Sequence, residues 1–276
     1  MRRRGAGFTL LELLISMALI GIILAALFSF FSQSSNVSAQ SSSRAELQQE
    51  VLNAQQLIAG KLKEAWYIYP SGTTMTLGGS NNTNNTRRNP LAPAASSQTW
   101  TTGTQPILAM ILPPTTAGTT NYRFYAYYPV LRSVWIAATG GTSAPTSSNP
   151  GSDTLNDSST WILAEYRATV TVASPVAFPA TPPTPPTTGD ANLLVDYIAP
   201  TNTTGNTYTM FDSLAAISTT GMSGTGTGSA STYVPGVTLN LATTRKTGGT
   251  TLRLPDATDE YSLTVYPTNL GKIAAN

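Results

Sequence analysis

The most constraining feature of this chain is a long uncharged segment near its N-terminus, because no Asp, Glu, Lys or Arg lies between Glu12 and Arg44. Its first 19 residues, from Leu13 to Phe31, are apolar except for two serines and one glycine. A helix of that length spans about 28 Å at about 1.5 Å per residue, close to the thickness of one bilayer hydrocarbon core. The segment therefore predicts a helix that crosses a membrane.

Three arginines, at positions 2, 3 and 4, precede this segment. The positive-inside rule places such a cluster in the cytoplasm and sends the chain beyond the span to the other side. The whole chain has 276 residues, of which 41% are hydrophobic and only 10% charged, so the exported part is long enough to bury a core. We expect a single-pass protein with most of its mass exported.

Three interpretations of the segment compete. A cleaved signal peptide, with a small-residue site at 37–39 before Gln40, conflicts with an apolar stretch longer than the usual ~7–15 residues and with Glu12 beside it. A plain transmembrane anchor explains the length and the orientation but leaves Glu12 unexplained. A carboxylate inside a bilayer costs about 2.5–3.5 kcal/mol, so such a group normally has a partner or a function.

The third interpretation rests on the sequence Gly7-Phe8-Thr9-Leu10-Leu11-Glu12 followed by the apolar helix. This arrangement resembles the class III signal of type IV prepilins and of the pseudopilins of type II secretion. The resemblance implies a leader of residues 1–7, cleavage after Gly7 by a prepilin peptidase on the cytoplasmic side, and N-methylation of Phe8. Glu12 would become the fifth mature residue, and its carboxylate would pair with the N-terminal amine of a neighbouring subunit in an apolar filament core.

The chain after the span supports a long helix. A polar, serine-rich stretch over 32–43 is followed by apolar residues at helical spacing between positions 47 and 65. No proline occurs before Pro70, which permits one helix from Phe8 to about Trp66, about 88 Å long. A flexible serine linker before a separate helix is the alternative. We divide the chain into a leader (1–7), a membrane-spanning and filament-core helix (8–31), an amphipathic stalk (32–68) and an exported head (69–276).

The head is rich in Thr, Ser, Asn, Gly and Pro, with short β-branched and aromatic runs between turn residues. Its clearest strand covers 161–172, where the alternation predicts a buried face of even-numbered residues and a solvated face of Glu165, Arg167, Thr169 and Thr171. Further strands are predicted at 107–112, 122–128, 131–137, 237–242, 251–254 and 261–266, with a hairpin turn at Gly248-Gly249 and loops over 78–89, 179–189 and 221–231.

These patterns predict an α+β fold, a pilin-like lollipop in which a long N-terminal helix packs on an antiparallel β-rich head. A second small sheet could extend the main one. This fold explains why the helical pattern comes first along the chain and the β patterns follow it.

Composition restricts the chemistry available to the head. The chain has no His and no Cys, which excludes Ser-His-Asp and Cys-His catalysis, zinc sites built on those residues, and disulfides. Residues 221–225 lack the last glycine of a nucleophile elbow, and the glycines at 224–228 lack the dinucleotide-binding spacing. We therefore predict no enzymatic activity, no cofactor and no metal site.

A few weaker candidates remain. Two acidic pairs, Asp153 with Asp157 and Asp190 with Asp196, carry oxygen ligands suited to calcium, but solvated turn aspartates are the favoured interpretation. The N-x-Ser/Thr triplets at Asn81, Asn84, Asn156 and Asn202 are expected by chance in a Thr-rich chain.

One further group could contact a nucleic acid through phosphate contacts and stacking. It combines two adjacent arginines with scattered aromatics, namely Arg87, Arg88, Trp100, Tyr122, Tyr125, Tyr127 and Tyr128. Alternating tyrosines in a strand usually pack against neighbours, so we favour a structural role for them.

The combined prediction is a minor pilin, a structural and assembly subunit of a type IV pilus, held in the inner membrane before assembly and in a cell-surface pilus afterwards. The resemblance implies as partners other major and minor pilins, the prepilin peptidase, the inner-membrane assembly platform and the membrane itself. Removal of residues 1–7 leaves 269 residues, longer than a typical major pilin and similar to PilW-type minor pilins and J-type pseudopilins.

Alternatives stay open at this point. One is a type II secretion pseudopilin, and another is a tip adhesin or DNA-binding minor pilin that serves DNA uptake; a membrane-anchored hydrolase is remote. Two departures from the family pattern, the missing cysteine pair and the absence of proline from the second half of the span, leave the subfamily open.

Overall fold

The structure is a computed structural model of the whole chain. It describes residues 9–78, 86–92, 98–116, 118–138, 149–172, 182–201, 207–219, 231–247 and 249–271. The leader prediction and the cleavage site at Gly7 and Phe8 lie outside these residues, as do 79–85 of the loop predicted over 78–89, 179–181 of the loop over 179–189, and 221–230 of the loop over 221–231.

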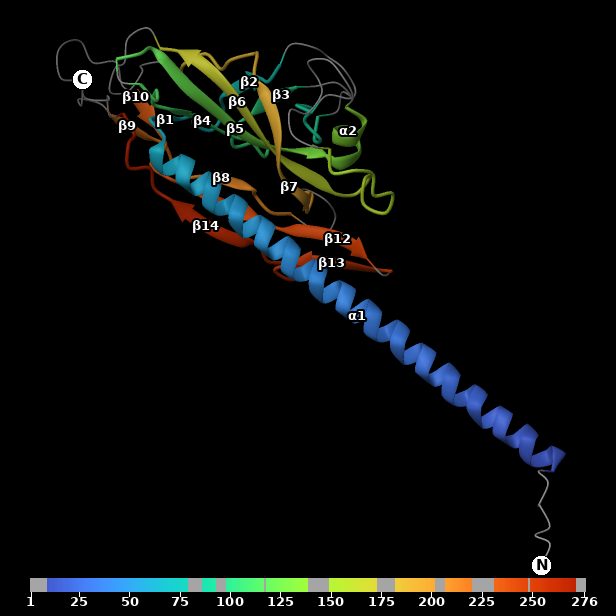
Figure 1. Cartoon of the computed structure of the whole chain (residues 1–276). Coiled ribbons are helices and arrows are strands. Elements are labelled where there is room, and N and C mark those ends of the chain that lie inside the picture. The colour runs from blue at the N-terminus through green and yellow to red at the C-terminus, as the bar shows by residue number, and fades with distance from the viewer. Residues whose placement is uncertain are drawn as a thin grey trace, which may run out of the picture.

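One helix, α1 (Leu10–Glu64), forms the stem of the molecule and runs without a break for 55 residues. Its N-terminal half projects away from the rest of the chain, and its C-terminal half lies along the head (Figure 1). The serine-rich stretch is helical throughout, so the prediction of a continuous helix is confirmed. Helix α1 is also the one described helix that is long and apolar enough to cross a membrane.

The head is built on a seven-stranded antiparallel sheet in the order β1-β4-β5-β6-β7-β12-β13. Its strands are β1 (Tyr67–Ile68), β4 (Leu108–Leu112), β5 (Asn121–Leu131), β6 (Trp161–Thr171), β7 (Asp190–Ile198), β12 (Thr243–Thr247) and β13 (Thr250–Leu254). A second sheet has the order β14-β11-β8, with β14 (Tyr261–Val265), β11 (Val237–Leu241) and β8 (Phe211–Ser213). The α+β lollipop with an additional small sheet is therefore confirmed.

Two short antiparallel pairs complete the head. They are β2 (Thr74–Thr76) with β3 (Thr99–Thr101), and β9 (Ile217–Thr219) with β10 (Ser231–Tyr233). A short helix, α2 (Arg132–Ala137), follows β5 directly. Strands β9 and β10 lie beyond the end of α1, at the pole of the head farthest from the N-terminus (Figure 1).

The main sheet is buried on both faces. On one face, α1 and the β14-β11-β8 sheet pack onto it, so that Val51, Ile58 and Leu62 of α1 join Leu163 and Leu239 in one apolar cluster. The other face carries a second, aromatic cluster that includes Trp66, Trp100, Phe124, Tyr128, Trp135 and Tyr166. This second face is covered in part by the β2-β3 hairpin, whose Met75 and Trp100 belong to the same cluster.

Burial on both faces corrects one prediction for the strand at 161–172. The strand itself is confirmed as β6, and its even-numbered face is buried as predicted in Ile162, Ala164 and Tyr166. Glu165, placed by the alternation on the solvated face, is 2% exposed because it shares that face with Leu163, which lies in the cluster beneath α1. The Tyr127 hydroxyl donates to the Glu165 carboxylate over 2.8 Å, which compensates for part of its desolvation.

The strand predicted at 131–137 is wrong. Strand β5 continues through Pro129 to Leu131, and the chain then turns into α2, where Val134 and Trp135 are buried. An apolar run this short fits either a strand or a buried helical turn, so its pattern alone does not distinguish them.

The remaining predicted strands agree with β4, β5, β11, β13 and β14 within one to three residues at each end. The hairpin is confirmed as well, since Thr247 pairs with Thr250 and Gly249 has a φ of +80°, a conformation that suits glycine. Strands β7 and β12 were not predicted, and neither were the short strands β1, β2, β3, β8, β9 and β10.

The packing of α1 on the head predicts that replacing two leucines of this helix by alanine lowers the free energy of unfolding by different amounts. Leu62 is fully buried, so Leu62→Ala should lower the free energy of unfolding by about 2–5 kcal/mol through lost contacts and a residual cavity. Leu57 is 41% exposed, and Leu57→Ala should change it by no more than about 0.5 kcal/mol. Denaturant unfolding of the full chain in detergent measures both. Equal effects would show that α1 does not pack on the head as described.

Candidate assembly site

The N-terminal end of α1 is closed by a reciprocal pair of hydrogen bonds. The backbone N–H of Glu12 donates to Thr9 Oγ1 over 3.3 Å, and the backbone N–H of Thr9 donates to Glu12 Oε2 over 3.0 Å. The Thr9 hydroxyl also lies 3.0 Å from the same carboxylate oxygen. This capping box satisfies backbone donors that the first turn of any helix leaves free.

The capping box also fixes where the Glu12 charge lies. The carboxylate folds back toward the N-terminal end of the helix, where the helix dipole stabilises a negative charge. Glu12 is exposed, and its side chain approaches no other described residue than Thr9 by hydrogen bond or ion pair. The predicted N-terminal residue, Phe8, directly precedes Thr9 in sequence and lies outside the described residues, as does Gly7.

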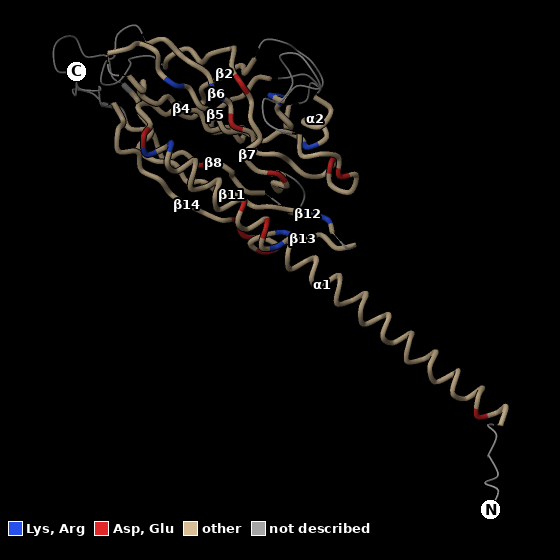
Figure 2. Tube along the Cα trace, viewed as in Figure 1, with Lys and Arg blue, Asp and Glu red and all other residues tan. Residues whose placement is uncertain are grey.

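The helix behind this carboxylate is apolar on all sides. Large side chains from Leu10 to Phe31 are 46–82% exposed, and no residue of the projecting half is buried within the chain. Figure 2 shows this half without charge except for the acidic group at its tip. An exposed apolar surface of this extent is stable only against lipid or against other apolar helices.

Polar contacts connect the stem to the head at several levels along the C-terminal half of α1. Gln40 donates to the Thr250 hydroxyl over 3.0 Å at the tip of the β12-β13 hairpin. Glu46 lies 3.8 Å from Arg245 of β12. Farther along, the buried Gln55 amide donates to the backbone carbonyls of Leu239 and Tyr261 in the small sheet. The stem is thus attached by hydrogen bonds and by packing.

A buried arginine is the centre of a cluster of polar side chains in the head. The Arg132 side chain is 1% exposed and binds Asp196 with two nitrogens, Nε at 2.9 Å and Nη2 at 3.0 Å. It also pairs with Asp157, and Nη2 donates to the Gly151 carbonyl over 3.0 Å. Several charge-assisted hydrogen bonds therefore offset the cost of burying this guanidinium group.

The same cluster reaches the stem. The backbone N–H of Asp196 donates to Glu50 Oε1 of α1 over 2.8 Å. Two guanidinium groups lie near the Tyr197 ring centre, that of Arg132 at 4.9 Å and that of Arg245 at 4.5 Å. Tyr197 also has a φ of +55°, which is uncommon outside glycine. We refer to Arg132, Asp157, Asp196, Tyr197 and Glu50 as the junction cluster.

The junction cluster contains residues that sequence reasoning either missed or interpreted differently. Arg132, Tyr197 and Glu50 were not singled out. Asp157 and Asp196 come from the two different acidic pairs that were considered as calcium ligands and interpreted as turn aspartates, and the structure brings them together on Arg132. Asp196 is 8% exposed, so its interpretation as a solvated turn residue is wrong. No group of three acidic side chains suited to a metal occurs among the described residues.

Most of the residues considered for contact with a nucleic acid are buried in the structure and are not available to a ligand. Tyr122, Tyr125, Tyr127, Tyr128 and Trp100 are all buried, as the packing interpretation predicted. Arg87 is buried too, donates to the Gly189 carbonyl, and lies 5.6 Å from the Tyr166 ring centre. Of the N-x-Ser/Thr triplets, Asn156 is fully buried and bonded to the backbone of Lys246, while Asn81, Asn84 and Asn202 lie outside the described residues.

Comparison with known proteins identifies the N-terminal segment alone. Residues 2–28 match the family model of the prokaryotic N-terminal methylation motif. No curated protein and no solved structure matches the chain. The matched residues contain the Thr9–Glu12 capping box and most of the exposed apolar half of α1.

The burial of Arg132 predicts a large cost for its removal. Arg132→Met should lower the free energy of unfolding by about 3–5 kcal/mol, because it leaves Asp157 and Asp196 without their common partner. Arg123 is the matched control, since its pair with Glu64 is partly exposed and Arg123→Met should cost about 1 kcal/mol or less. Urea unfolding curves compare the two, and similar costs would contradict the central role of Arg132.

Burial, followed by the charges of Asp196 and Glu46, raises the pKa of Glu50 above its ordinary value of 4.5, although the hydrogen bond from Asp196 and the charge of Arg245 oppose the shift. A carboxyl whose folded pKa is raised favours the folded state while protonated, and that contribution is lost as the pH rises from 4.5 through the folded pKa. Glu50→Gln keeps an oxygen that accepts the Asp196 N–H but does not ionise. The stability of Glu50→Gln relative to wild type should therefore increase with pH over this window, as measured by thermal unfolding. A constant difference would contradict the assignment.

Proposed function

We propose that this type IV prepilin-like protein is a minor pilin, an assembly subunit that enters a type IV pilus through its N-terminal helix. The observation that carries the proposal is the Glu12 carboxylate, held at the tip of an exposed apolar helix within the matched methylation motif. The apolar helix and the class III signal fit membrane anchoring and surface display. The proposed mature chain begins at Phe8, with the span over Leu13 to Phe31, a stalk to residue 68 and a head over 69–276.

The proposed assembly step follows from charge neutralisation. Cleavage after Gly7 by a prepilin peptidase would create a positive amine on Phe8. A lone carboxylate or a lone ammonium group inside an apolar bundle costs several kcal/mol, and a close pair of opposite charges offsets much of that cost. The capping box directs the Glu12 carboxylate toward the N-terminal end of α1, and this orientation supports a pairing with the amine of an adjacent subunit at the same axial position. The pairing would then fix the axial position of each new subunit relative to its neighbour in the filament.

A minor rather than a major subunit is proposed from the size of the part that follows the stem. Two sheets and two short strand pairs follow α1, over more than 200 residues. The same N-terminal geometry would serve a pseudopilin of type II secretion. Immunogold labelling of surface filaments separates these two roles, because a pseudopilin would remain in the cell envelope.

Processing of the N-terminus is the first prediction to test. Intact-protein and peptide mass spectrometry of the protein purified from its native membrane should find a chain that starts at N-methylated Phe8. A chain that starts at Gln40 would identify a secreted protein without an anchor. An intact Met1 would identify a simple membrane-tethered protein, and either result would end the pilin proposal.

Glu12→Ala should leave cleavage after Gly7 nearly intact and reduce incorporation into pili by at least about tenfold, because the charge pair with the neighbouring amine is lost. Quantitative blotting of sheared pili against the membrane fraction measures the incorporation. Ser16→Ala is the matched control, since its hydroxyl bonds only to the backbone carbonyl of Glu12 within the same helix. Normal incorporation of the Glu12 variant would refute its role.

A further inference from the structure

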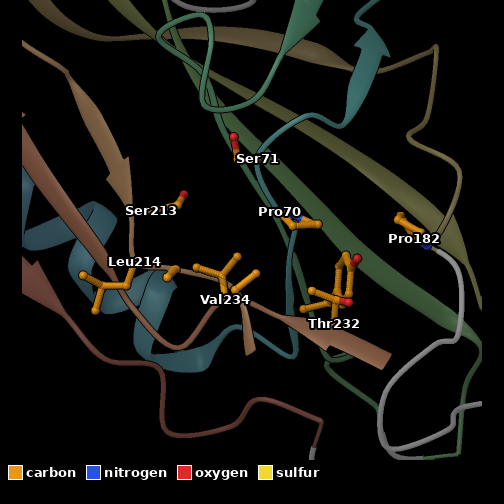
Figure 3. A pocket seen from close by; sticks show the side chains of 10 residues that line it. Pro70, Ser71, Pro182, Ser213, Leu214, Thr232 and Val234 are labelled. Carbon is orange, nitrogen blue, oxygen red and sulfur yellow. The ribbon is translucent and has the colours of Figure 1, made fainter. Parts of the chain in front are cut away.

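A cavity of about 340 Å³ lies at the pole of the head farthest from the N-terminus. Four segments that are distant in sequence form its walls (Figure 3). Pro70 and Ser71 come from the turn after β1, Ser213 and Leu214 from the end of β8, and Thr232 and Val234 from β10 and the residues after it; Pro182, ahead of β7, closes the opposite side. The volume falls within the range of about 300–1,000 Å³ typical of small-molecule sites.

The chemistry of these walls is uniform. Among the described residues that line the cavity, none is charged. The apolar part consists of prolines, alanines, Leu214 and Val234, and the polar part consists of hydroxyl groups, on Tyr67, Ser71, Ser213 and Thr232. A hydroxyl group both donates and accepts hydrogen bonds, so this site complements a ligand whose polar groups do the same.

Tyr67 provides the most specific indication of a ligand. Its side chain is almost completely buried, with the residue 2% exposed, yet it lines the cavity and its hydroxyl makes no hydrogen bond to any described residue. Its ring is held by the Tyr69 ring, edge to face at 5.2 Å between ring centres. Burial raises the pKa of Tyr67 to about 12, so the phenol stays protonated and able to donate. The Tyr67 hydroxyl oxygen is not among the enclosed side-chain atoms that lack a partner, so it opens to the cavity, where a polar group of a bound molecule would replace water as its partner.

We propose that this cavity binds a neutral saccharide, with the Tyr67 hydroxyl hydrogen-bonded to a sugar hydroxyl. A sugar ring combines hydroxyls that donate and accept with an apolar C–H face, which matches the hydroxyl groups and the proline and aliphatic walls. An acidic sugar or a phosphate would be desolvated without a cation to pair with. A peptide would bring backbone groups that need a strand edge or a regular set of partners.

Because the cavity lies far from the apolar helix, saccharide binding would be a function separate from subunit assembly. The apolar half of the stem lies at one end of the molecule, and strands β1 and β10, which contribute Tyr67 and Thr232 to the cavity, lie at the other (Figure 1). A subunit at the tip of a filament would present it outward, toward a glycan-bearing surface. Binding itself needs only the folded head, so it is tested without assembled pili and independently of the Glu12 experiment.

The experiment uses the full-length protein in detergent micelles, screened by glycan array against neutral, sialylated and sulfated saccharides. Hits are followed by calorimetric titration. The expected result is selective binding of neutral saccharides, with Tyr67→Phe weakening the affinity about tenfold through loss of one hydrogen bond. Tyr122→Phe removes the same atom from a buried ring outside the cavity and should leave the affinity unchanged. Ala216→Trp at the exposed rim should abolish binding by filling the opening, without touching the core.

Three results would overturn the proposal. One is the absence of binding to any neutral saccharide at millimolar concentration. Another is that the protein binds acidic and neutral saccharides equally well and that Ala216→Trp does not reduce this binding. That result would show that the saccharide binds outside the cavity. The third is competition for the cavity by a proline-rich peptide that binds more tightly than any saccharide, which would reassign the site to peptide recognition. Thermal unfolding of each variant separates loss of binding from loss of folding.

Discussion

The burial of one face of α1 against the head is the interaction on which the rest of the structure depends. Val51, Ile58 and Leu62 close the apolar cluster that the main sheet and the small sheet share. Without the helix, both sheets would expose an apolar face to water, at about 25 cal/mol for each Å² of apolar surface. The same helix continues as an exposed apolar rod. One element therefore completes the core of the head and presents the exposed apolar surface that fits a membrane anchor.

The polar groups at the junction add directional order to this packing. Apolar contacts alone would tolerate small slides of the helix along the sheet, because they are not directional. The Glu50 carboxylate accepts from the Asp196 backbone, and Asp196 in turn holds Arg132. Each of these bonds has a narrow range of acceptable geometry, so together they select one register of stem against head.

The sequence predicted best those features whose residue pattern is local along the chain. The methylation motif over residues 2–28, the continuous helix and strand β6 follow from patterns that are local along the chain. The junction cluster could not be predicted in this way, because Glu50 and Asp196 lie 146 positions apart and only the fold brings them together. Glu165 and Asp196 were placed in solvent because charge predicts exposure unless a partner is known. Helix α2 was missed because six residues are too few for periodicity to distinguish a helix from a strand.

The unbroken course of α1 has a consequence for how the head is oriented. The β12-β13 hairpin first contacts the stem at Gln40, only nine residues beyond Phe31, and those residues are helical. A helix turns by about 100° and rises by about 1.5 Å with each residue. The serine-rich stretch is thus a rigid helical spacer that fixes both the distance and the rotation between its two ends. Its length, rather than any contact of its own, determines how the head is rotated about the helix axis relative to the apolar half of α1 and how far the head stands from that half.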